Sequence, residues 1–255
     1  MRTRIGVAGI AGRMGRLLAE EIVAAGAVLA GGIDRPGAEV AGTTRFADIA
    51  ALAAACDIVV DFTHASTVQP HAAALAAAGT AWVIGTTGLS DADEAAIAAA
   101  SARIAVVQSP NYSPGVTLVL ALAERMAAAL PGDAYDAEIV EMHHRQKVDA
   151  PSGTALGLGR AVAKGRGVDL DAVRASGRDG HTGARKPGEI GFAALRGGQV
   201  VGEHTLLFAG ATEHISITHR AFDRRAFATG AVRAALWAAG RPAGRYSMMD
   251  VLGMT

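Results

Sequence analysis

Short runs of aliphatic and β-branched residues alternate with alanine-rich helical stretches along the first part of the chain, up to about residue 108. The runs that we predict as buried strands are 5–8, 28–33, 58–62, 82–84 and 104–107. A turn over 9–15 leads into a helix that ends near Ala25, and capping-box spacing between Ser66 and Gln69 predicts the start of another helix. Strands that alternate with helices form a parallel sheet covered by helices, so this region is predicted to be α/β.

The pattern changes after Pro114. The elements predicted beyond it are a helix over 116–130 and strands over 137–141, 189–195, 199–208 and 213–219. In the last strand Ile215 and Ile217 alternate with polar residues, which indicates a sheet with one polar face. An unusually polar stretch occupies 143–154, and residues 176–188 have the composition of a long surface or active-site loop. This second region is predicted to be α+β.

Composition places the chain among globular proteins. Hydrophobic residues make up 51% and charged residues 19% of the 255 residues, with a mean hydropathy of +0.27, so the chain is too apolar to be disordered. The 24 basic and 24 acidic residues cancel, which leaves no whole-chain field to attract nucleic acid or an anionic membrane, and we expect neither as a partner. No apolar run reaches the roughly 18 residues of a membrane span.

The single cysteine, Cys56, lies in an alanine-rich run. One cysteine cannot form an intramolecular disulfide, which suits a reducing compartment, and we expect Cys56 to be a small core residue. The N-terminus lacks the apolar region of a signal peptide. A cytoplasmic location is therefore predicted.

The turn after the first predicted strand carries glycines at 9, 12 and 15. A glycine-rich turn between a strand and a helix lets the backbone approach a pyrophosphate. The spacing GxxGxxG departs from the commoner GxGxxG, so a tight turn without a ligand stays an alternative. Asp34, at the end of the second strand, favours a dinucleotide because it can hydrogen-bond the ribose hydroxyls. Arg35 could instead pair with a 2′-phosphate, so NAD and NADP both stay open, beside the alternative of a solvated turn.

Two further loops lie at the predicted carboxyl ends of strands. Their sequences are Gly-Thr-Thr-Gly over 85–88 and Ser-Pro-Asn-Tyr-Ser over 109–113. Ligands of open parallel sheets bind at that edge. Glycine, serine and threonine are also ordinary turn residues, but together with the glycine turn these loops outline a cofactor crevice.

The most informative segment runs from Glu141 to Ala155, with the sequence EMHHRQKVDAPSGTA. Its cluster of positive charge precedes Pro-Ser-Gly-Thr and a predicted helix, whose free N–H groups would bind carboxylates. Histidine can exchange protons at neutral pH, and lysine can donate one and hold an anion. The alternative is a solvated basic loop. No metal site is predicted, because His143 and His144 are adjacent and no HExxH or cysteine pair accompanies them.

Other chemistries find little support. The chain has no GxxxxGK[ST] phosphate loop and no GxSxG nucleophile elbow. The remaining histidines are interpreted as ordinary surface or core residues: His64, His71, His181, His204, His214 and His219.

The chain resembles the dihydrodipicolinate reductase family, also named 4-hydroxy-tetrahydrodipicolinate reductase. The segments that carry the resemblance are GIAGRMGR (9–16), DFT (61–63), IGTTG (84–88), EMHHRQKVDAPSGTAL (141–156), GHTGAR (180–185), PGEIGFA (187–193), VGEHT (201–205) and ITHRAF (217–222). His64 departs from the pattern, since some relatives carry arginine after DFT. The resemblance implies reduction of 4-hydroxy-tetrahydrodipicolinate, through its dehydrated form, to tetrahydrodipicolinate in the diaminopimelate route to lysine. NADH or NADPH would supply the hydride to this small dicarboxylate.

The family fold implies a Rossmann-type dinucleotide-binding domain over 1–113 and 225–255, with an inserted α+β domain over 114–224 that binds substrate and assembles a homotetramer. By position, His143 resembles the acid/base residue and Lys147 the proton donor. The substrate-binding positions correspond to His144, Gly153 and Thr154. The cofactor-binding positions correspond to Gly9, Ile10, Ala11, Gly12, Arg13, Met14, Asp34, Arg35, Gly85, Thr86, Thr87, Ser109, Pro110, Asn111 and Tyr112.

Two other functions stay open at this point. Another Rossmann oxidoreductase acting on an amino dicarboxylate, such as an aspartate dehydrogenase, would keep the glycines and the basic pocket but is expected to lack the contiguous HHRQKVDAPSGTA. A non-catalytic nicotinamide-sensing protein would bind cofactor without turnover and would not need His143 and Lys147.

Overall fold

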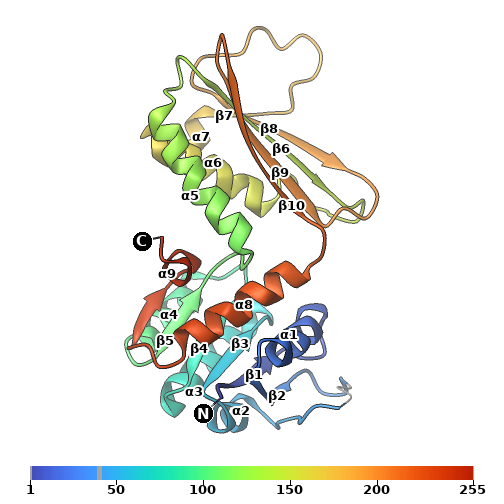
Figure 1. Ribbon diagram of the computed structural model, residues 1–255, viewed down its shortest axis with the longest axis vertical. Helices are drawn as coiled ribbons and strands as arrows, with labels where there is room; N and C mark the ends of the chain where they lie inside the picture. Colours follow the sequence, from blue (N-terminus) through green and yellow to red (C-terminus); the bar gives the residue numbers. More distant parts are fainter. Residues whose placement is uncertain (1, 39–41, 255) are drawn as a thin grey trace. The chain divides into compact units, whose positions relative to one another are not determined.

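Figure 1 shows the computed structural model, which describes residues 2–38 and 42–254. The chain forms two compact units. The first contains the residues up to Pro114 together with those from Arg225 on, and the second contains Gly115–Arg224. The first unit is therefore discontinuous in sequence, because the chain leaves it once and returns to complete it.

The first unit is built on one parallel sheet. Its strands are, in order across the sheet, β11 (Gly244–Tyr246), β5 (Ala105–Gln108), β4 (Ala81–Ile84), β3 (Ile58–Asp61), β1 (Arg4–Ala8) and β2 (Val28–Ile33). Every neighbouring pair is parallel, so the carboxyl ends lie along one edge. The α/β prediction is confirmed, with strand ends shifted by a residue at most. The short strand β11 was not predicted, because Gly-Arg-Tyr carries no apolar pattern.

Helices cover both faces of this sheet. One face carries α1 (Arg13–Ala24), α8 (Arg225–Ala238) and α9 (Met248–Leu252), and the other carries α2 (Ile49–Ala55), α3 (Val68–Ala78) and α4 (Asp91–Ser101). The strands are apolar throughout because both faces are buried, and Val59, Val60 and Ile84 have no exposed surface. Burying one such side chain contributes about 1.5 to 3 kcal/mol. Cys56, which ends α2, is buried as predicted.

The helix after β3 begins differently from the prediction. A 3-10 turn, η1 (Ala65–Thr67), precedes α3, and its N-cap is His64, whose Nδ1 accepts a hydrogen bond from the Ser66 N–H at 3.2 Å. Gln69 donates instead to Asp93 at 2.9 Å. The capping box predicted for Ser66 and Gln69 is therefore wrong, because both side chains have other partners.

The second unit contains a mixed sheet. Its strands are, in order, β10 (His214–Ala221), β9 (Gly202–Ala209), β6 (Asp136–His143), β8 (Ile190–Arg196) and β7 (Arg174–Ser176). β9 is antiparallel to both of its neighbours, whereas β6, β8 and β7 run parallel. α5 (Pro114–Ala129), α6 (Gly153–Arg166) and α7 (Leu170–Val173) lie against one face (Figure 1). The α+β prediction is confirmed, although β7 and α7 were not predicted.

β6 is longer than predicted and ends at His143 instead of residue 141. It continues because its partner does: Met142 and His143 pair with Leu195 and Arg196 of β8. His143 therefore belongs to a strand and not to the polar loop. Side chains alternate along a strand, so Glu141 and His143 share the buried, helix-covered face with the core residues of β6.

On β10, the opposite face of this sheet is polar, as predicted. On β10, Ser216 and Thr218 are exposed, and Thr218 hydrogen-bonds Thr205 across the strands at 3.0 Å. The segment 177–189 contains no helix or strand and is mostly exposed, as predicted for the long loop. Within 2–38 and 42–254, no helix is long and apolar enough to span a bilayer.

Candidate functional site

The glycine turn links β1 to α1 at the carboxyl edge of the parallel sheet. Gly9 has φ +83°, a conformation that favours glycine. A Cβ on Gly15 would lie 2.1 Å from the Gly9 carbonyl oxygen, so the helix can approach the turn only with glycine there. The N–H groups of Gly9 and Ile10 donate to the Ile33 carbonyl at 2.9 and 3.2 Å. The turn is thus fixed to the end of β2, and Arg13 and Met14 begin α1 directly behind it.

Asp34 follows β2 and is held by two backbone N–H groups. Its Oδ2 accepts from Ala11 at 2.7 Å and its Oδ1 accepts from Arg35 at 2.8 Å. The Arg45 guanidinium donates to the carbonyls of Arg35 and Ala38, at 2.9 and 2.7 Å. These bonds fix a carboxylate beside the glycine turn and place the Arg35 backbone next to it.

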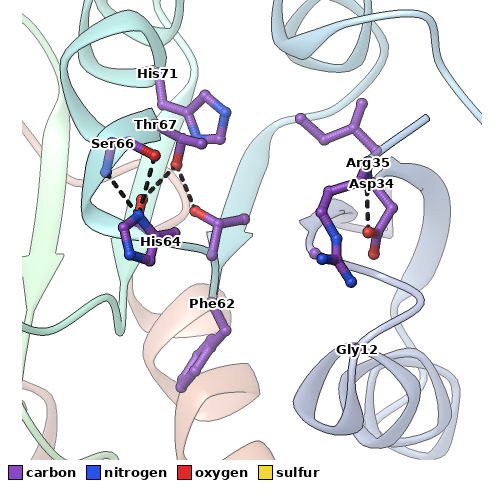
Figure 2. Close-up of a pocket in the computed structure, with 11 residues that line it drawn as sticks. Gly12, Asp34, Arg35, Phe62, His64, Ser66, Thr67 and His71 are labelled. Atoms are coloured by element: carbon purple, nitrogen blue, oxygen red, sulfur yellow. Dashed lines mark hydrogen bonds between the residues drawn. The ribbon is translucent and has the colours of Figure 1, made fainter. Parts of the chain in front are cut away.

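A cavity of about 640 Å³ opens beside these groups. Its lining residues are Gly9, Gly12, Ile33, Asp34, Arg35, Phe62, Thr63, His64, Ser66, Thr67 and His71. Figure 2 shows Asp34 and Arg35 on one side and His64, Ser66, Thr67 and His71 on the other. The second wall, from the end of β3 into α3, was not predicted. The sequence held one indication of this wall, because its residues follow the carboxyl end of the third predicted strand, 58–62.

Buried hydrogen bonds tie the new wall to the sheet. Thr63 donates to Asp61 at 2.6 Å and shares a 2.7 Å hydrogen bond with Thr67. His71 Nδ1 lies 2.7 Å from Asp61 Oδ2, and Trp82 Nε1–H donates to the same oxygen at 3.3 Å. The interpretation of His64 and His71 as ordinary residues overlooked their place in this wall.

The other predicted cofactor loops follow β4 and β5 at the same sheet edge. The Thr86 hydroxyl is buried and finds no hydrogen-bond partner among the described residues. Tyr112, in contrast, is buried with its hydroxyl 2.8 and 2.9 Å from the carbonyl oxygens of Ile84 and Val107. Its side chain supports the core, so only its backbone is left to face a ligand.

These features fit a dinucleotide. The turn brings backbone close to the positive end of α1, which suits a pyrophosphate. Asp34 supplies acceptors for ribose hydroxyls, and the unpartnered Thr86 hydroxyl is a buried polar group of the kind that a bound ligand satisfies. The residues of the first unit could therefore hold a nicotinamide nucleotide.

In the second unit, the predicted catalytic histidine is held by a buried carboxylate. His143 Nδ1 lies 2.6 Å from Glu141 Oε2, and the Glu141 side chain is only 1% exposed. Because a carboxylate only accepts, the His143 Nδ1–H is the donor. Glu141 also accepts from the Ser152 N–H at 3.0 Å and from both terminal nitrogens of Arg196 at 2.8 Å.

Lys147 and the substrate-binding candidates lie in the loop between β6 and α6 and in the first turn of α6. The Lys147 ammonium donates to both oxygens of Asp149, at 2.8 and 2.9 Å, which holds the pKa of Asp149 below its usual value. The buried Nδ1 of His144 lacks a hydrogen-bond partner in the part of the chain described. Gly153 and Thr154 open α6, where backbone N–H groups favour a carboxylate.

Burial sets the protonation of this cluster. It lowers the pKa of His143, against the opposing effect of Glu141, and lowers the pKa of His204 to about 4. Burial would raise the pKa of Glu141, but the hydrogen bonds from Arg196, His143 and the Ser152 backbone together keep it below its usual value. Glu141 is therefore ionised, and both histidines are neutral near pH 7.

Four members of the cluster were not predicted as site residues: Glu141, Ser152, Arg196 and His204. The His204 and His143 rings meet edge to face with centroids 5.0 Å apart, and His204 Nε2 lies 2.9 Å from the Ser152 hydroxyl. The alternation of Gly202, His204 and Leu206 along β9 could have placed His204 on the inner face. Only the sheet order brings it beside Glu141, its register partner. Among the described residues, no group of three His, Cys, Asp or Glu is arranged to hold a metal ion.

Comparison with known families gives two matches that together span nearly the whole chain. The family model described as "Dihydrodipicolinate reductase, N-terminus" matches residues 3–112, and "Dihydrodipicolinate reductase, C-terminus" matches residues 115–252. A 4-hydroxy-tetrahydrodipicolinate reductase of Granulibacter bethesdensis is 68% identical over 254 residues, covering 98% of this chain and 97% of the relative. The enzyme of the same name from Acidiphilium cryptum is 63% identical over 251 residues, with 98% of each chain covered.

Solved structures share the fold. Dipicolinate-bound dihydrodipicolinate reductase from Paenisporosarcina sp. TG-14 superposes with a TM-score of 0.80 at 22% identity, covering 98% of this chain and 99% of that one. GenD2 from gentamicin A biosynthesis, in complex with NAD, has a TM-score of 0.61 at 20% identity, covering 99% and 91%. At these identities the likeness concerns the architecture alone.

Proposed function

Because the chain belongs to the dihydrodipicolinate reductase family, we propose that its nucleotide pocket and its His143 cluster serve the two halves of one reaction. The reaction is reduction of 4-hydroxy-tetrahydrodipicolinate with a nicotinamide cofactor in the diaminopimelate route to lysine. The observation that carries the assignment of residues is the buried acid–base pair of His143 and Glu141, with Lys147 on the adjoining loop.

The first unit is proposed as the dinucleotide-binding domain. The glycine turn, Arg13 and Met14 at the start of α1, and the loops at 85–87 and 109–112 contribute backbone and small side chains along the sheet edge. A bound nicotinamide nucleotide supplies the hydride, and the protein fixes its orientation. Asp34 accepts hydrogen bonds from the adenosine ribose.

The second unit is proposed as the substrate-binding domain. The first turn of α6, with Gly153 and Thr154, and the side chain of His144 bind the carboxylates of the substrate. Hydride addition to a conjugated imine leaves negative charge, which the Lys147 ammonium stabilises and then neutralises with a proton. His143 exchanges a proton through Nε2, since its Nδ1–H is engaged by Glu141.

NADH or NADPH is proposed as the cofactor. Asp34 suits the two hydroxyls of the NADH ribose, whereas the exposed Arg35 beside it suits the 2′-phosphate of NADPH. Arg35→Ala is expected to lower kcat/KM for NADPH about tenfold, the value of one charge-assisted contact, and to leave NADH within about twofold. Asp34→Asn should favour NADPH instead. Equal losses with both nucleotides would contradict this division.

The proposed assembly is a homotetramer formed through the second unit, as in the family. Val140 and Leu195 are 39% and 52% exposed on the face of the sheet away from α5 and α6. Sedimentation equilibrium of the purified chain measures the mass directly. A monomer at micromolar concentration would overturn the assembly but not the activity.

The deciding experiment is the loss of absorbance at 340 nm when substrate is generated from aspartate semialdehyde, pyruvate and a synthase. NADH and NADPH are supplied in parallel. Oxidation of either supports the proposed reaction and its ratio gives the preference. Cofactor binding without oxidation would instead favour a different amino dicarboxylate or a sensing protein, and oxaloacetate with ammonia would then test the aspartate dehydrogenase alternative.

A further inference from the structure

We infer that Glu141 and Arg196 are positioning residues that fix His143 in the tautomer protonated at Nδ1, and so reserve Nε2 for proton exchange with the substrate. The inference rests on the proposed role of His143. Neither residue need touch the substrate, because both act through the imidazole ring.

The Glu141 carboxylate is saturated with donors. Oε1 accepts from the Ser152 N–H and one Arg196 nitrogen, while Oε2 accepts from His143 and the other Arg196 nitrogen, all within 3.0 Å. A carboxylate offers about four acceptor positions, so this one has none to spare. The group is ionised and immobile, and the imidazole N–H that it accepts is held in direction as well as in distance.

Arg196 connects this carboxylate to the loop that carries Lys147. Besides Glu141, its guanidinium donates to the Asp149 carbonyl at 2.7 Å and to its own neighbour, Leu195, at 2.6 Å. The Asp149 side chain in turn pairs with Lys147. One planar cation thus ties the strand that holds His143 to the segment that holds the proposed proton donor, which a lysine could not do with the same geometry.

The free nitrogen of the ring faces a position without a side chain. A Cβ added to Gly202, on the neighbouring strand β9, would lie 3.0 Å from His143 Nε2. A side chain there would crowd Nε2. Glycine at 202 therefore keeps a Cβ away from Nε2, while the Nδ1 side is fully bonded.

The electrostatic surroundings are consistent with this division. The titratable groups facing the ring are Glu141 on its own strand, Arg196 from β8, His204 from β9 and Lys147 from the loop; His219 of β10 lies beyond His204. Burial, Lys147 and Arg196 lower the pKa of His143, and Glu141 raises it. Replacing Glu141 by an uncharged group therefore lowers that pKa further.

The test is Glu141→Gln, measured by imidazole ¹⁵N NMR and by kinetics. In the wild type, Nδ1 should carry the proton of the neutral ring. In the variant, the Nε2-protonated tautomer should appear, the His143 titration should move to lower pH, and kcat should fall about 100-fold, the low end for acid–base catalysis. KM should change less than about threefold. Arg196→Lys should retain part of the population in the Nδ1-protonated tautomer and should lose less activity than Glu141→Gln.

Glu138→Gln is the matched control. Glu138 lies on the same strand and also accepts from arginines through both oxygens, here from Arg178 and Arg185, but on the opposite face of the sheet. It should leave the tautomer, the titration and kcat unchanged. Thermal unfolding of all variants reports whether each is folded.

The inference is overturned if wild-type His143 carries its neutral-state proton on Nε2, a measurement that needs no variant. It is also overturned if Glu141→Gln is folded and leaves both the tautomer and the titration unchanged. His143→Gln separates this failure from failure of the proposed function, because full activity of that variant would remove His143 from the reaction whatever Glu141 does.

Discussion

The two candidate sites differ in the chemical groups that form them. In the first unit, the proposed nucleotide pocket consists of turns at the edge of a parallel sheet, where glycines and backbone N–H groups do most of the positioning. In the second unit, the cluster around His143 consists of charged side chains on the buried face of a mixed sheet. The first site depends on how close the backbone can come, and the second on charges that satisfy one another.

This difference determines which substitutions each site tolerates. A backbone turn accepts many changes of side chain but not an added Cβ at its tightest position. A saturated network of buried charges accepts no single removal without leaving a partner uncompensated. The expected effects below follow from that contrast.

Lys147→Ala should have the largest effect on activity. The proposed proton donor is lost, so kcat falls by at least about 100-fold, while the dissociation constant for NADPH, whose proposed site lies in the other unit, stays unchanged. Steady-state assays measure kcat, and stopped-flow fluorescence measures the dissociation constant for NADPH. Lys164→Ala, on the exposed side of α6, is the control. Wild-type turnover in Lys147→Ala would remove this residue from the reaction.

Gly15→Ala should instead impair nucleotide binding at the candidate site of the first unit. The added Cβ would meet the Gly9 carbonyl oxygen at 2.1 Å and the Ile10 Cα at 2.5 Å, so the turn must open. Nucleotide affinity should be lost and the free energy of unfolding should fall by about 1 to 3 kcal/mol. Gly157→Ala, inside α6 with Leu120 at 3.4 Å as its nearest neighbour, should instead be neutral or stabilising. Urea unfolding measures the free energy of unfolding of both variants. Equal losses in Gly15→Ala and Gly157→Ala would contradict this prediction.

A smaller effect is expected from pH. The pKa of His204 lies near 4 in the folded chain and has its ordinary value of 6.5 in the unfolded chain. Between these two pH values the unfolded chain binds a proton at His204 and the folded chain does not. Stability from this group is complete above pH 6.5 and is lost as pH falls toward 4. Between pH 7.5 and 5 it should decrease by up to about 2 kcal/mol.

His204→Gln should remove this part of the pH dependence, measured as the difference in the free energy of unfolding at the two pH values. His181→Gln, in the exposed loop, should not. If both variants keep the wild-type dependence, His204 is not its source.

The smallest effect on activity is expected for the thiol of the first unit. Burial raises the pKa of Cys56 to about 11, and its Sγ–H donates to the Leu52 carbonyl at 3.1 Å. Alkylation by iodoacetamide at pH 8 should therefore be at least about 100-fold slower in the native chain than in urea, with no change in activity while the thiol stays unmodified. Fast native labelling would show that this part of the core opens readily.

The two regions also differ in how far the sequence predicts them. Buried strands and the turn after β1 follow from local apolar runs and glycines, so the parallel sheet, Asp34 and the position of the pocket could be predicted. The partners of Glu141 could not, because Arg196 stands 55 residues away and reaches it only through the register of β6 with β8. Likewise, His143 belongs to β6 because it pairs with Arg196 of β8, although the polar stretch that begins at His143 predicted that the strand ends before it.

The discontinuity of the first unit has a consequence for biosynthesis. The glycine turn and the first five strands of the parallel sheet leave the ribosome early, but α8 and β11, which cover and extend that sheet, are made last. The inserted unit is continuous in sequence and can be complete before them. During translation, the apolar strands of the parallel sheet therefore lack α8 and α9 on one face until the end of synthesis. A ribosome that stalls after Arg224 releases a chain with a complete second unit and an incomplete first unit.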